Sequence, residues 1–233
     1  MKVLLVRHGE RADECGESND RFDPPLTAQG KAQAASAWSK ILGAHEISSL
    51  RVYTSSMTRC METTCGVISS LGSSSSVDLT IVPGLASCAA AINRLGSIRS
   101  DDVPARLKSS KEATERGQEL SLNSAKVNWG FLDDGTTASS YVGGAEDAWW
   151  EEGEKEWVKA MRTVLSHTEE GEGCEVCVVV THREGIRTLV RMLTAGAQRA
   201  RTTFCCVASF SGGGAALALE DLTYEDCVAF EEY

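Results

Sequence analysis

Four consecutive apolar residues near the start of the chain run directly into a histidine flanked by arginines. Residues 3–6 read VLLV, Arg7, His8 and Gly9 follow, and Arg11 lies two positions further on. A short continuous apolar run that ends at a glycine is typical of a strand buried on both faces of a parallel sheet. Open α/β sheets bind ligands at the carboxyl ends of their strands. We therefore expect a phosphate site here, in which guanidinium groups bind phosphate oxygens and the imidazole acts as nucleophile or acid–base group.

Strand and helix patterns alternate after this first strand. An alanine-rich amphipathic helix is expected over 28–42, a strand over 50–54, a helix over 58–71 and a further strand over 78–82. This succession is the signature of βαβ units and a parallel sheet. Near the end, 203–219 has the pattern of a glycine-linked hairpin at the sheet edge. The sequence predicts an α/β fold, a three-layer α/β/α sandwich around a mostly parallel sheet.

The length of the chain limits the number of domains, and its net charge limits the classes of binding partner. With 233 residues, we expect a single domain over 1–233, with a variable insertion or cap at about 86–143, where no strong period is visible. The net charge of −10 argues against nucleic-acid and anionic-membrane partners, which need a basic surface. The first expected strand begins at Lys2, so we expect no signal peptide, and no apolar run approaches the roughly 20 residues that span a bilayer. A cytoplasmic protein is the expectation.

A second apolar strand also ends on a histidine. The run at 176–180 is followed by Thr181 and His182, while Arg59 comes shortly after the strand at 50–54. Because parallel strands present their carboxyl ends on one side of the sheet, we expect Arg7, His8, Arg59 and His182 to meet around one anion. This set suits phosphoryl transfer, since arginines stabilise the charge on the equatorial oxygens. No P-loop and no carboxylate cluster is visible, so we expect no metal and no cofactor, with arginines supplying the positive charge.

Four ordered motifs resemble those of the histidine phosphatase superfamily, which includes the phosphoglycerate mutases. They are RHGER at 7–11, DPPLTAQG at 23–30, SSMTR at 55–59 and TH at 181–182. The first two are most similar to the branch of the UBA- and SH3-containing tyrosine phosphatases and the ecdysteroid-phosphate phosphatases. The resemblance runs from residue 3 to about 195, leaves the middle unmatched, and implies a phosphoglycerate mutase-like fold.

The resemblance implies a role for each matching residue. His8 would be the nucleophile that becomes phosphorylated, with its ring held by a neighbouring backbone carbonyl. Arg7, Arg11 and Arg59 would bind the phosphoryl oxygens. His182 would be the second histidine, which hydrogen-bonds the phosphoryl group and stabilises the transition state.

The general acid departs from the family pattern. Related phosphatases carry a glutamate shortly after a Pro-Gly-Leu that follows the third strand, but here 83–85 is followed by Ala-Ser-Cys. Glu184 is the best substitute, because another branch of the superfamily has a similar His-x-Glu with the glutamate as proton donor. Glu184 could equally place its negative charge at the start of the next helix, where it is favourable. Asp23 and Glu10 are lesser candidates.

The prediction for function is a metal-independent phosphomonoester phosphatase that acts through a phosphohistidine on His8. The expected substrate is a phosphorylated small molecule or a phosphoprotein, and a homodimer is left open. One alternative is a phosphoglycerate-type mutase, which the missing mutase-type glutamate region disfavours. The other is a catalytically weak member that binds a phospho-ligand or a protein, suggested by the missing carboxylate after Leu85.

Overall fold

The computed structural model describes residues 1–20, 23–44, 50–70, 77–86, 110–120, 127–132, 148–170, 175–196, 199–212, 217–224 and 228–230. Its strands are β1 (Lys2–Arg7), β2 (Leu50–Thr54), β3 (Val77–Ile81), β4 (Val127–Phe131), β5 (Val176–Thr181), β6 (Arg199–Arg201), β7 (Val207–Ser211), β8 (Ala218–Tyr224) and β9 (Val228–Phe230). Its helices are α1 (Ala28–Ala44), α2 (Thr58–Ser70), α4 (Ser110–Leu120), α5 (Ala148–Glu170) and α6 (Arg183–Leu193).

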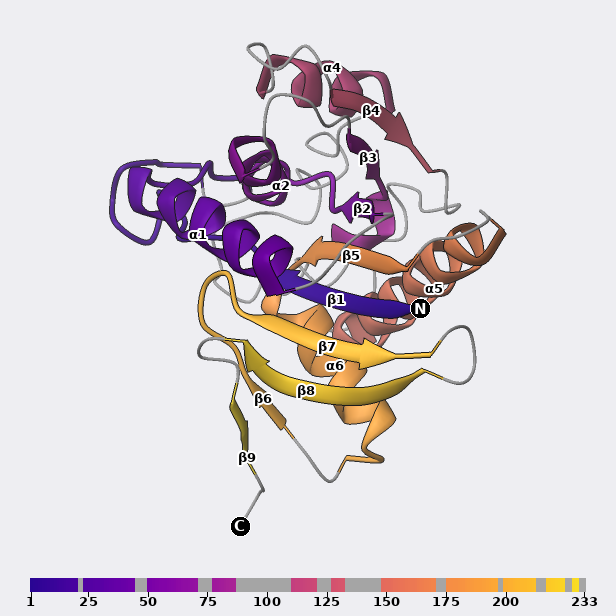
Figure 1. The fold of residues 1–233 in the computed structure, drawn as a ribbon. Helices are drawn as coiled ribbons and strands as arrows, with labels where there is room; N and C mark the ends of the chain where they lie inside the picture. The colour runs from indigo at the N-terminus through magenta and orange to yellow at the C-terminus, as the bar shows by residue number, and fades with distance from the viewer. Residues whose placement is uncertain are drawn as a thin grey trace.

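Apart from β6 and β9, which pair with each other, the strands form one sheet with helices packed on it (Figure 1). It has seven strands in the order β4-β3-β2-β5-β1-β7-β8. The pairs from β4 to β1 are all parallel, while β7 runs antiparallel to both β1 and β8. The prediction of a mostly parallel sheet with an edge hairpin is confirmed. The decisive feature for function is that β1 and β5, far apart in the chain, are neighbours in the middle of the sheet.

Alternating side chains of the central strands fill two separate cores. In β1, Val3 and Leu5 pack into the core that also holds Trp157 of α5 and Ile186 of α6. The intervening residues of β1 point to the opposite face, where the core includes Trp38 of α1. Helices therefore cover both faces of the sheet, with α5 and α6 on one side and α1, α2 and α4 on the other. This confirms the three-layer sandwich.

The segment 86–143, expected to form an insertion or cap, contributes to the sheet itself. Within it, β4 pairs in parallel with β3 at the sheet edge, and α4 contacts both β4 and α2. A glycine in α4 lies against Trp129 of β4, so helix and strand approach closely. The rest of the segment lies outside the described residues, and a cap there stays a prediction.

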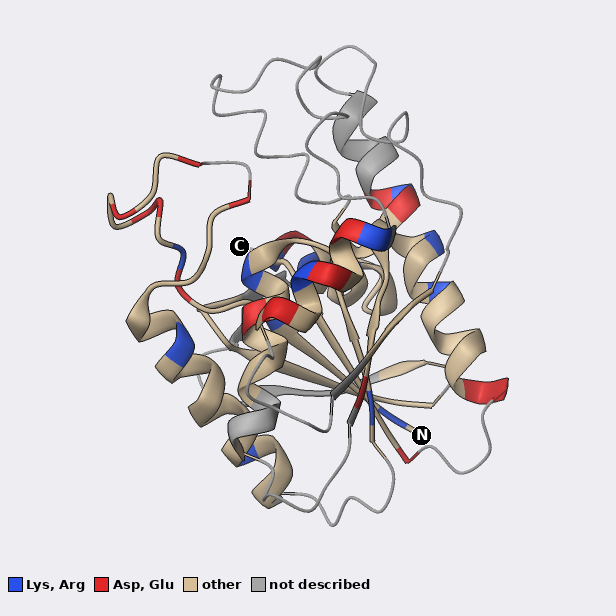
Figure 2. Cartoon of the chain, turned by 90° about the horizontal axis from the view of Figure 1, so that it is seen from above, with Lys and Arg blue, Asp and Glu red and all other residues tan. Residues whose placement is uncertain are grey.

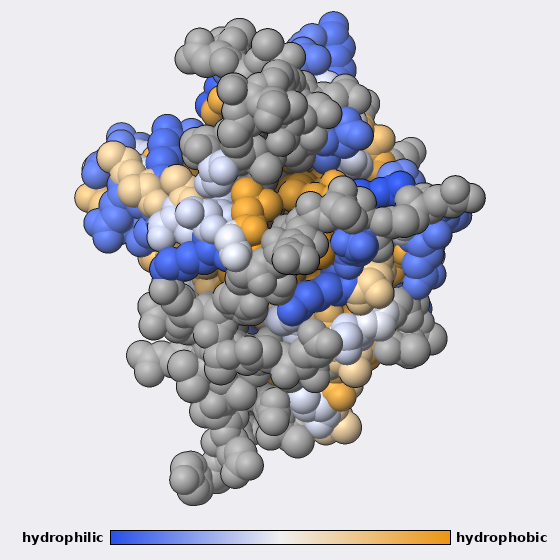
Figure 3. Space-filling view, in the orientation of Figure 1, coloured by the Kyte–Doolittle hydropathy of each residue, from blue (hydrophilic) through white to orange (hydrophobic). Residues whose placement is uncertain are grey.

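The described surface carries both polar and apolar residues in the view of Figure 3. In Figure 3, hydrophobic atoms cluster in the middle of the face, between the side that carries α1 and the side that carries α5. Among the described helices, none combines the length and the apolar character needed to cross a membrane.

Candidate active site

The register of β1 against β5 places two histidines side by side. Arg7 is paired with Thr181, so the next residue of each strand is a histidine. The backbone N–H of His8 donates to the Thr181 carbonyl at 3.1 Å. The two imidazole centroids lie 5.4 Å apart, with the ring planes inclined by 62°. The predicted convergence of His8 and His182 at the carboxyl edge of the sheet is therefore found.

The ring of His8 has a defined orientation and tautomer. Its Nδ1 lies 2.8 Å from the Gly9 carbonyl oxygen. A carbonyl can only accept, so Nδ1 carries the proton and Nε2 of the neutral ring carries the lone pair. Burial lowers the pKa of His8 well below its usual value, and the charges of Arg59 and Arg7 lower it further. The ring is consequently neutral at physiological pH, the state in which Nε2 is nucleophilic.

A close backbone contact fixes the loop that carries His8. A Cβ added to Gly9 would lie 2.5 Å from the Gly30 carbonyl oxygen, and one added to Gly30 would collide with the Glu10 backbone. The Gly9 N–H donates to the Thr63 hydroxyl on α2 at 3.0 Å. The loop of residues 7–9, Arg-His-Gly (the RHG loop), is therefore held against the first turn of α1 and the side of α2. This close approach explains why Gly9 and Gly30 cannot carry a side chain.

Arg59 reaches the site from the first turn of α2. The Ser55 N–H donates to the Val180 carbonyl, which holds the chain after β2 against the end of β5. Asp23 then caps α2, with its carboxylate accepting from the Thr58 N–H at 2.6 Å and from the Thr58 hydroxyl at 2.8 Å. Arg59 is 1% exposed, and its Nη1 lies 4.0 Å from Asp23 Oδ1. A fully buried guanidinium is thus placed between a carboxylate and the two histidines.

His182 is oriented by Arg59 and Ser55. Arg59 Nη2 lies 3.3 Å from His182 Nδ1, and since a guanidinium only donates, Nδ1 accepts. The proton of the ring is then on Nε2, which lies 3.0 Å from the Ser55 hydroxyl oxygen. Burial, followed by the charge of Arg59, lowers the pKa of His182 well below its usual value. Both histidines are therefore neutral rings in a cationic surrounding.

A thiol beneath His182 does not compete with His8 as a nucleophile. Cys60 Sγ lies 3.6 Å from His182 Nε2, and its residue is fully buried. Burial raises the pKa of Cys60 to about 12. Because the reactive form of cysteine is the thiolate, this side chain is inert at neutral pH.

Arg7 is held by the loop between β6 and β7. Its Nη1 donates to the Thr202 carbonyl at 2.8 Å, and its guanidinium lies 4.2 Å from the centroid of the Phe204 ring. The Cys205 N–H donates to the His8 carbonyl at 3.3 Å. Among the described residues, no group accepts from the buried Arg7 Nε–H. Buried donors without a partner are uncommon in folded proteins, and this N–H is available to a bound anion.

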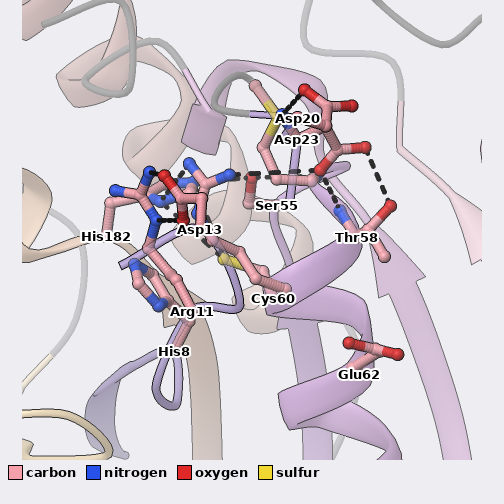
Figure 4. A network of polar contacts seen from close by, with 12 residues as sticks. His8, Arg11, Asp13, Asp20, Asp23, Ser55, Thr58, Cys60, Glu62 and His182 are labelled. Atoms are coloured by element: carbon pink, nitrogen blue, oxygen red, sulfur yellow. Dashed lines mark hydrogen bonds and ion pairs between the residues drawn. The ribbon is translucent and has the colours of Figure 1, made fainter. Parts of the chain in front are cut away.

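Arg11 lies near both histidines but is already paired within its own loop. Its charge contributes to lowering the pKa of His8 and of His182. Its Nε and Nη2 donate to the two oxygens of Asp13 at 2.9 and 2.6 Å, and Nη1 lies 3.4 Å from Glu14. Figure 4 shows Arg11 and Asp13 together beside His182 and above His8.

The three candidate proton donors differ in the hydrogen-bond partners that they contact. Glu184 lies in the first turn of α6, accepts from Arg183 Nε at 2.7 Å and is close enough to affect the pKa of Arg7. Both oxygens of Asp23 accept from Thr58, as Figure 4 also shows. Glu10 accepts from the Thr27 hydroxyl and the Cys15 thiol. The partner of Glu184, Arg183, is 47% exposed, and a substrate can displace such a surface ion pair at little cost.

Comparison with known families agrees with this geometry. The model of the histidine phosphatase superfamily (branch 1) matches residues 3–96, a stretch that contains Arg7, His8, Arg11 and Arg59. The match to this superfamily ends before His182 and Glu184. Both residues follow β5, which pairs with β1, so they lie at the same edge of the sheet as His8.

Solved structures of similar fold include members with different activities. The ecdysone phosphate phosphatase of Bombix mori, in complex with tungstate, is 16% identical, with 100% of this chain and 95% of that chain covered and a TM-score of 0.59. The phosphoglycerate mutase of Bacillus anthracis is 14% identical, with 94% and 91% covered and a TM-score of 0.56. At these identities the likeness concerns the fold, which is phosphoglycerate mutase-like. A comparison with curated proteins gives no match.

Several groups that complete the candidate site are missing from the sequence prediction. Ser55 and Thr63 orient His182 and the RHG loop, and the loop with Phe204 holds Arg7. Asp13 binds Arg11. Only Ser55 lies within a matching motif, whereas the others become visible through contacts between distant segments. Among the described residues, no group of three or more His, Cys, Asp or Glu side chains is arranged to hold a metal ion.

Proposed function

We propose that this protein is a member of the histidine phosphatase superfamily and a phosphomonoester phosphatase that acts through a phosphohistidine on His8. One observation carries the proposal. The Gly9 carbonyl fixes the Nδ1 proton of His8, so the lone pair of Nε2 belongs to a buried, neutral ring beside the guanidinium groups of Arg7 and Arg59. A positioned neutral nucleophile beside a cationic anion site is what a two-step phosphoryl transfer requires.

The chemistry follows from these positions. Arg7, Arg11 and Arg59 bind the phosphoryl oxygens and stabilise the charge that spreads over them in the transition state. His8 Nε2 attacks phosphorus, so that an N–P bond forms as the P–O bond to the leaving group breaks. Water then attacks the phosphohistidine and releases phosphate. His182 hydrogen-bonds the phosphoryl group once its Nε2–H turns from Ser55 to a phosphoryl oxygen.

The test of the function is turnover of p-nitrophenyl phosphate together with isolation of the phosphoenzyme. We expect equal amounts of nitrophenol and inorganic phosphate, and a phosphoenzyme that is labile in acid and stable in base, with the label on His8. Hydrolysis without label on His8 would contradict the mechanism. Transfer of the label to an added phosphoglycerate, without net release of phosphate, would identify a mutase instead.

We propose Glu184 as the group that protonates the leaving oxygen. Replacing Glu184 by glutamine should lower kcat on alkyl phosphates by about 10²- to 10⁴-fold, because an alkoxide leaves poorly without a proton. Nitrophenolate leaves readily, so turnover of p-nitrophenyl phosphate should change little. The measurement is the ratio of the two rates in the variant and in the parent protein.

Glu170→Gln is the matched control, because this glutamate is exposed at the end of α5. The control should leave the ratio unchanged. Equal losses on both substrates in Glu184→Gln would assign Glu184 to the start of α6 or to its ion pair with Arg183 rather than to proton donation.

A further inference from the structure

A carboxylate of the protein itself lies on one of the phosphate-binding arginines. Asp13 accepts two parallel hydrogen bonds from Arg11, at 2.9 and 2.6 Å, in the bidentate arrangement that guanidinium groups also form with phosphate. The side chains are 9% exposed for Asp13 and 13% for Arg11, so solvent screens the pair only weakly. This contact is stronger than an ordinary surface ion pair.

The charge of Asp13 also reaches the centre of the site. It is among the charges that act on Arg59, the guanidinium that hydrogen-bonds His182. In Figure 4, Asp13 lies in the same cluster as Arg11, His182 and His8, whereas Asp23 and Thr58 form a separate group beside it. The negative charge of Asp13 is therefore close to the place where the negative charge of a phosphoryl group would be bound.

The loop that carries Asp13 is acidic overall. Glu10, Asp13, Glu14 and Glu17 follow one another within eight positions after β1. Figure 2 shows several acidic segments along the loop between β1 and α1. Glu14 adds a second, weaker contact to Arg11 at 3.4 Å. Within this loop, Asp13 and Glu14 thus compensate the charge of an arginine that the proposed reaction needs for its substrate.

We propose that Asp13 is an internal anion that occupies Arg11 in the empty site, and that a phosphoryl group binds by displacing it. This inference rests on the proposed function and adds the residue that sets the affinity of the site for phosphate. In the empty protein, the Arg11 fork is satisfied and the buried cations are partly neutralised. On binding, Arg11 exchanges the two oxygens of Asp13 for two phosphoryl oxygens, and Asp13 turns toward solvent with its loop.

The experiment measures the binding of inorganic phosphate by isothermal titration calorimetry, which requires no turnover. Asp13→Asn keeps the shape of the side chain but removes its charge and one of its two acceptor oxygens. We expect the Kd for phosphate to fall about tenfold, because the ligand no longer competes with a charge-assisted hydrogen-bonded pair. The matched control is Glu17→Gln, which makes the same charge change at an exposed position of the same loop and should leave the Kd within twofold.

A double-mutant cycle tests whether the effect of Asp13→Asn on phosphate affinity depends on Arg11. When Arg11 is replaced by glutamine, the further change Asp13→Asn should no longer tighten phosphate binding. Persistent tightening would mean that Asp13 acts through general repulsion and would overturn the exchange.

An unchanged affinity for phosphate in Asp13→Asn would overturn the inference, because Asp13 would then not compete with the ligand. A weaker affinity would overturn it as well, because Asp13 would then orient Arg11 for the ligand. The thermal unfolding midpoint, measured without phosphate, shows whether a loss of phosphate affinity in Asp13→Asn comes from misfolding. If it does, Asp13→Ser tests the same expectation a second time. Failure of the proposed function is distinguishable, since absent hydrolysis with tighter phosphate binding in Asp13→Asn would leave the exchange intact.

Discussion

Replacing His8 by asparagine is expected to reduce kcat/KM for p-nitrophenyl phosphate by at least about 10³-fold, because the variant lacks the proposed nucleophile of the covalent intermediate. The asparagine amide can still donate to the Gly9 carbonyl, as His8 Nδ1 does at 2.8 Å, so the RHG loop should keep its conformation. The buried thiol of Cys60 cannot substitute, since its pKa is raised to about 12. The measurements are steady-state kinetics and labelling of the enzyme by radioactive phosphate, which should disappear altogether.

His167→Asn is the control for this experiment. His167 lies on α5 and bonds the Tyr53 hydroxyl, outside the cluster around His8. We expect its activity to stay close to that of the parent protein. If His8→Asn kept more than a tenth of the activity, a phosphohistidine at this position would be excluded and water would have to attack the substrate directly.

The second large effect is expected at Arg59. Changing Arg59 to glutamine should lower kcat/KM by about 10³-fold or more, the range seen when an arginine that stabilises the charge of a transferred phosphoryl group is lost. This guanidinium also donates to His182 Nδ1 at 3.3 Å, so its loss removes the group that orients the second histidine. The Kd for inorganic phosphate should rise in parallel, because Arg59 is expected to bind the ground state as well.

Because Arg59 is buried, its variant needs a measurement of folding. The Asp23 carboxylate keeps its bonds from the Thr58 N–H and hydroxyl, so α2 should remain capped and the protein folded. Arg116→Gln on α4 removes the same charge from the surface and should have no effect on kinetics. Arg59→Lys should lie in between, since it retains the charge without the planar fork. A folded Arg59→Gln with nearly normal kcat/KM would remove Arg59 from the reaction.

The parts of the site that could be predicted are those that strand patterns determine. Two apolar runs that each end in a histidine predict two buried neighbouring strands, and the βαβ order puts both histidines on one edge. Arg59 is predictable in the same way, because it follows β2, which pairs with β5. These residues depend on local pattern and on the general geometry of parallel sheets, and both can be read from a single sequence.

The remainder depends on contacts that no local pattern encodes. Asp13 is two positions from Arg11, but nothing in the sequence distinguishes it from the other acidic residues of its loop. The loop with Phe204 was expected to begin a hairpin strand, whereas β7 starts at Val207 and the residues before it contact Arg7 and His8. In the middle of the chain, the five residues of β4 (VNWGF) do alternate between apolar and polar or small residues, but so short a run does not stand out within the segment 86–143.

The contact between Gly9 and Gly30 has a consequence for how substitutions in this protein should be interpreted. Gly30 lies far from His8 in sequence and carries no functional group, yet its contact with the loop that carries His8 leaves no room for even a methyl group. A rate lost through change at Gly30 would therefore measure displacement of His8 rather than chemistry performed by α1. In a mutational scan, substitutions in this turn of α1 would lower activity as strongly as changes to His8 itself. The turn takes no part in the chemistry, and it matters only because the space between it and the loop is too small for a side chain.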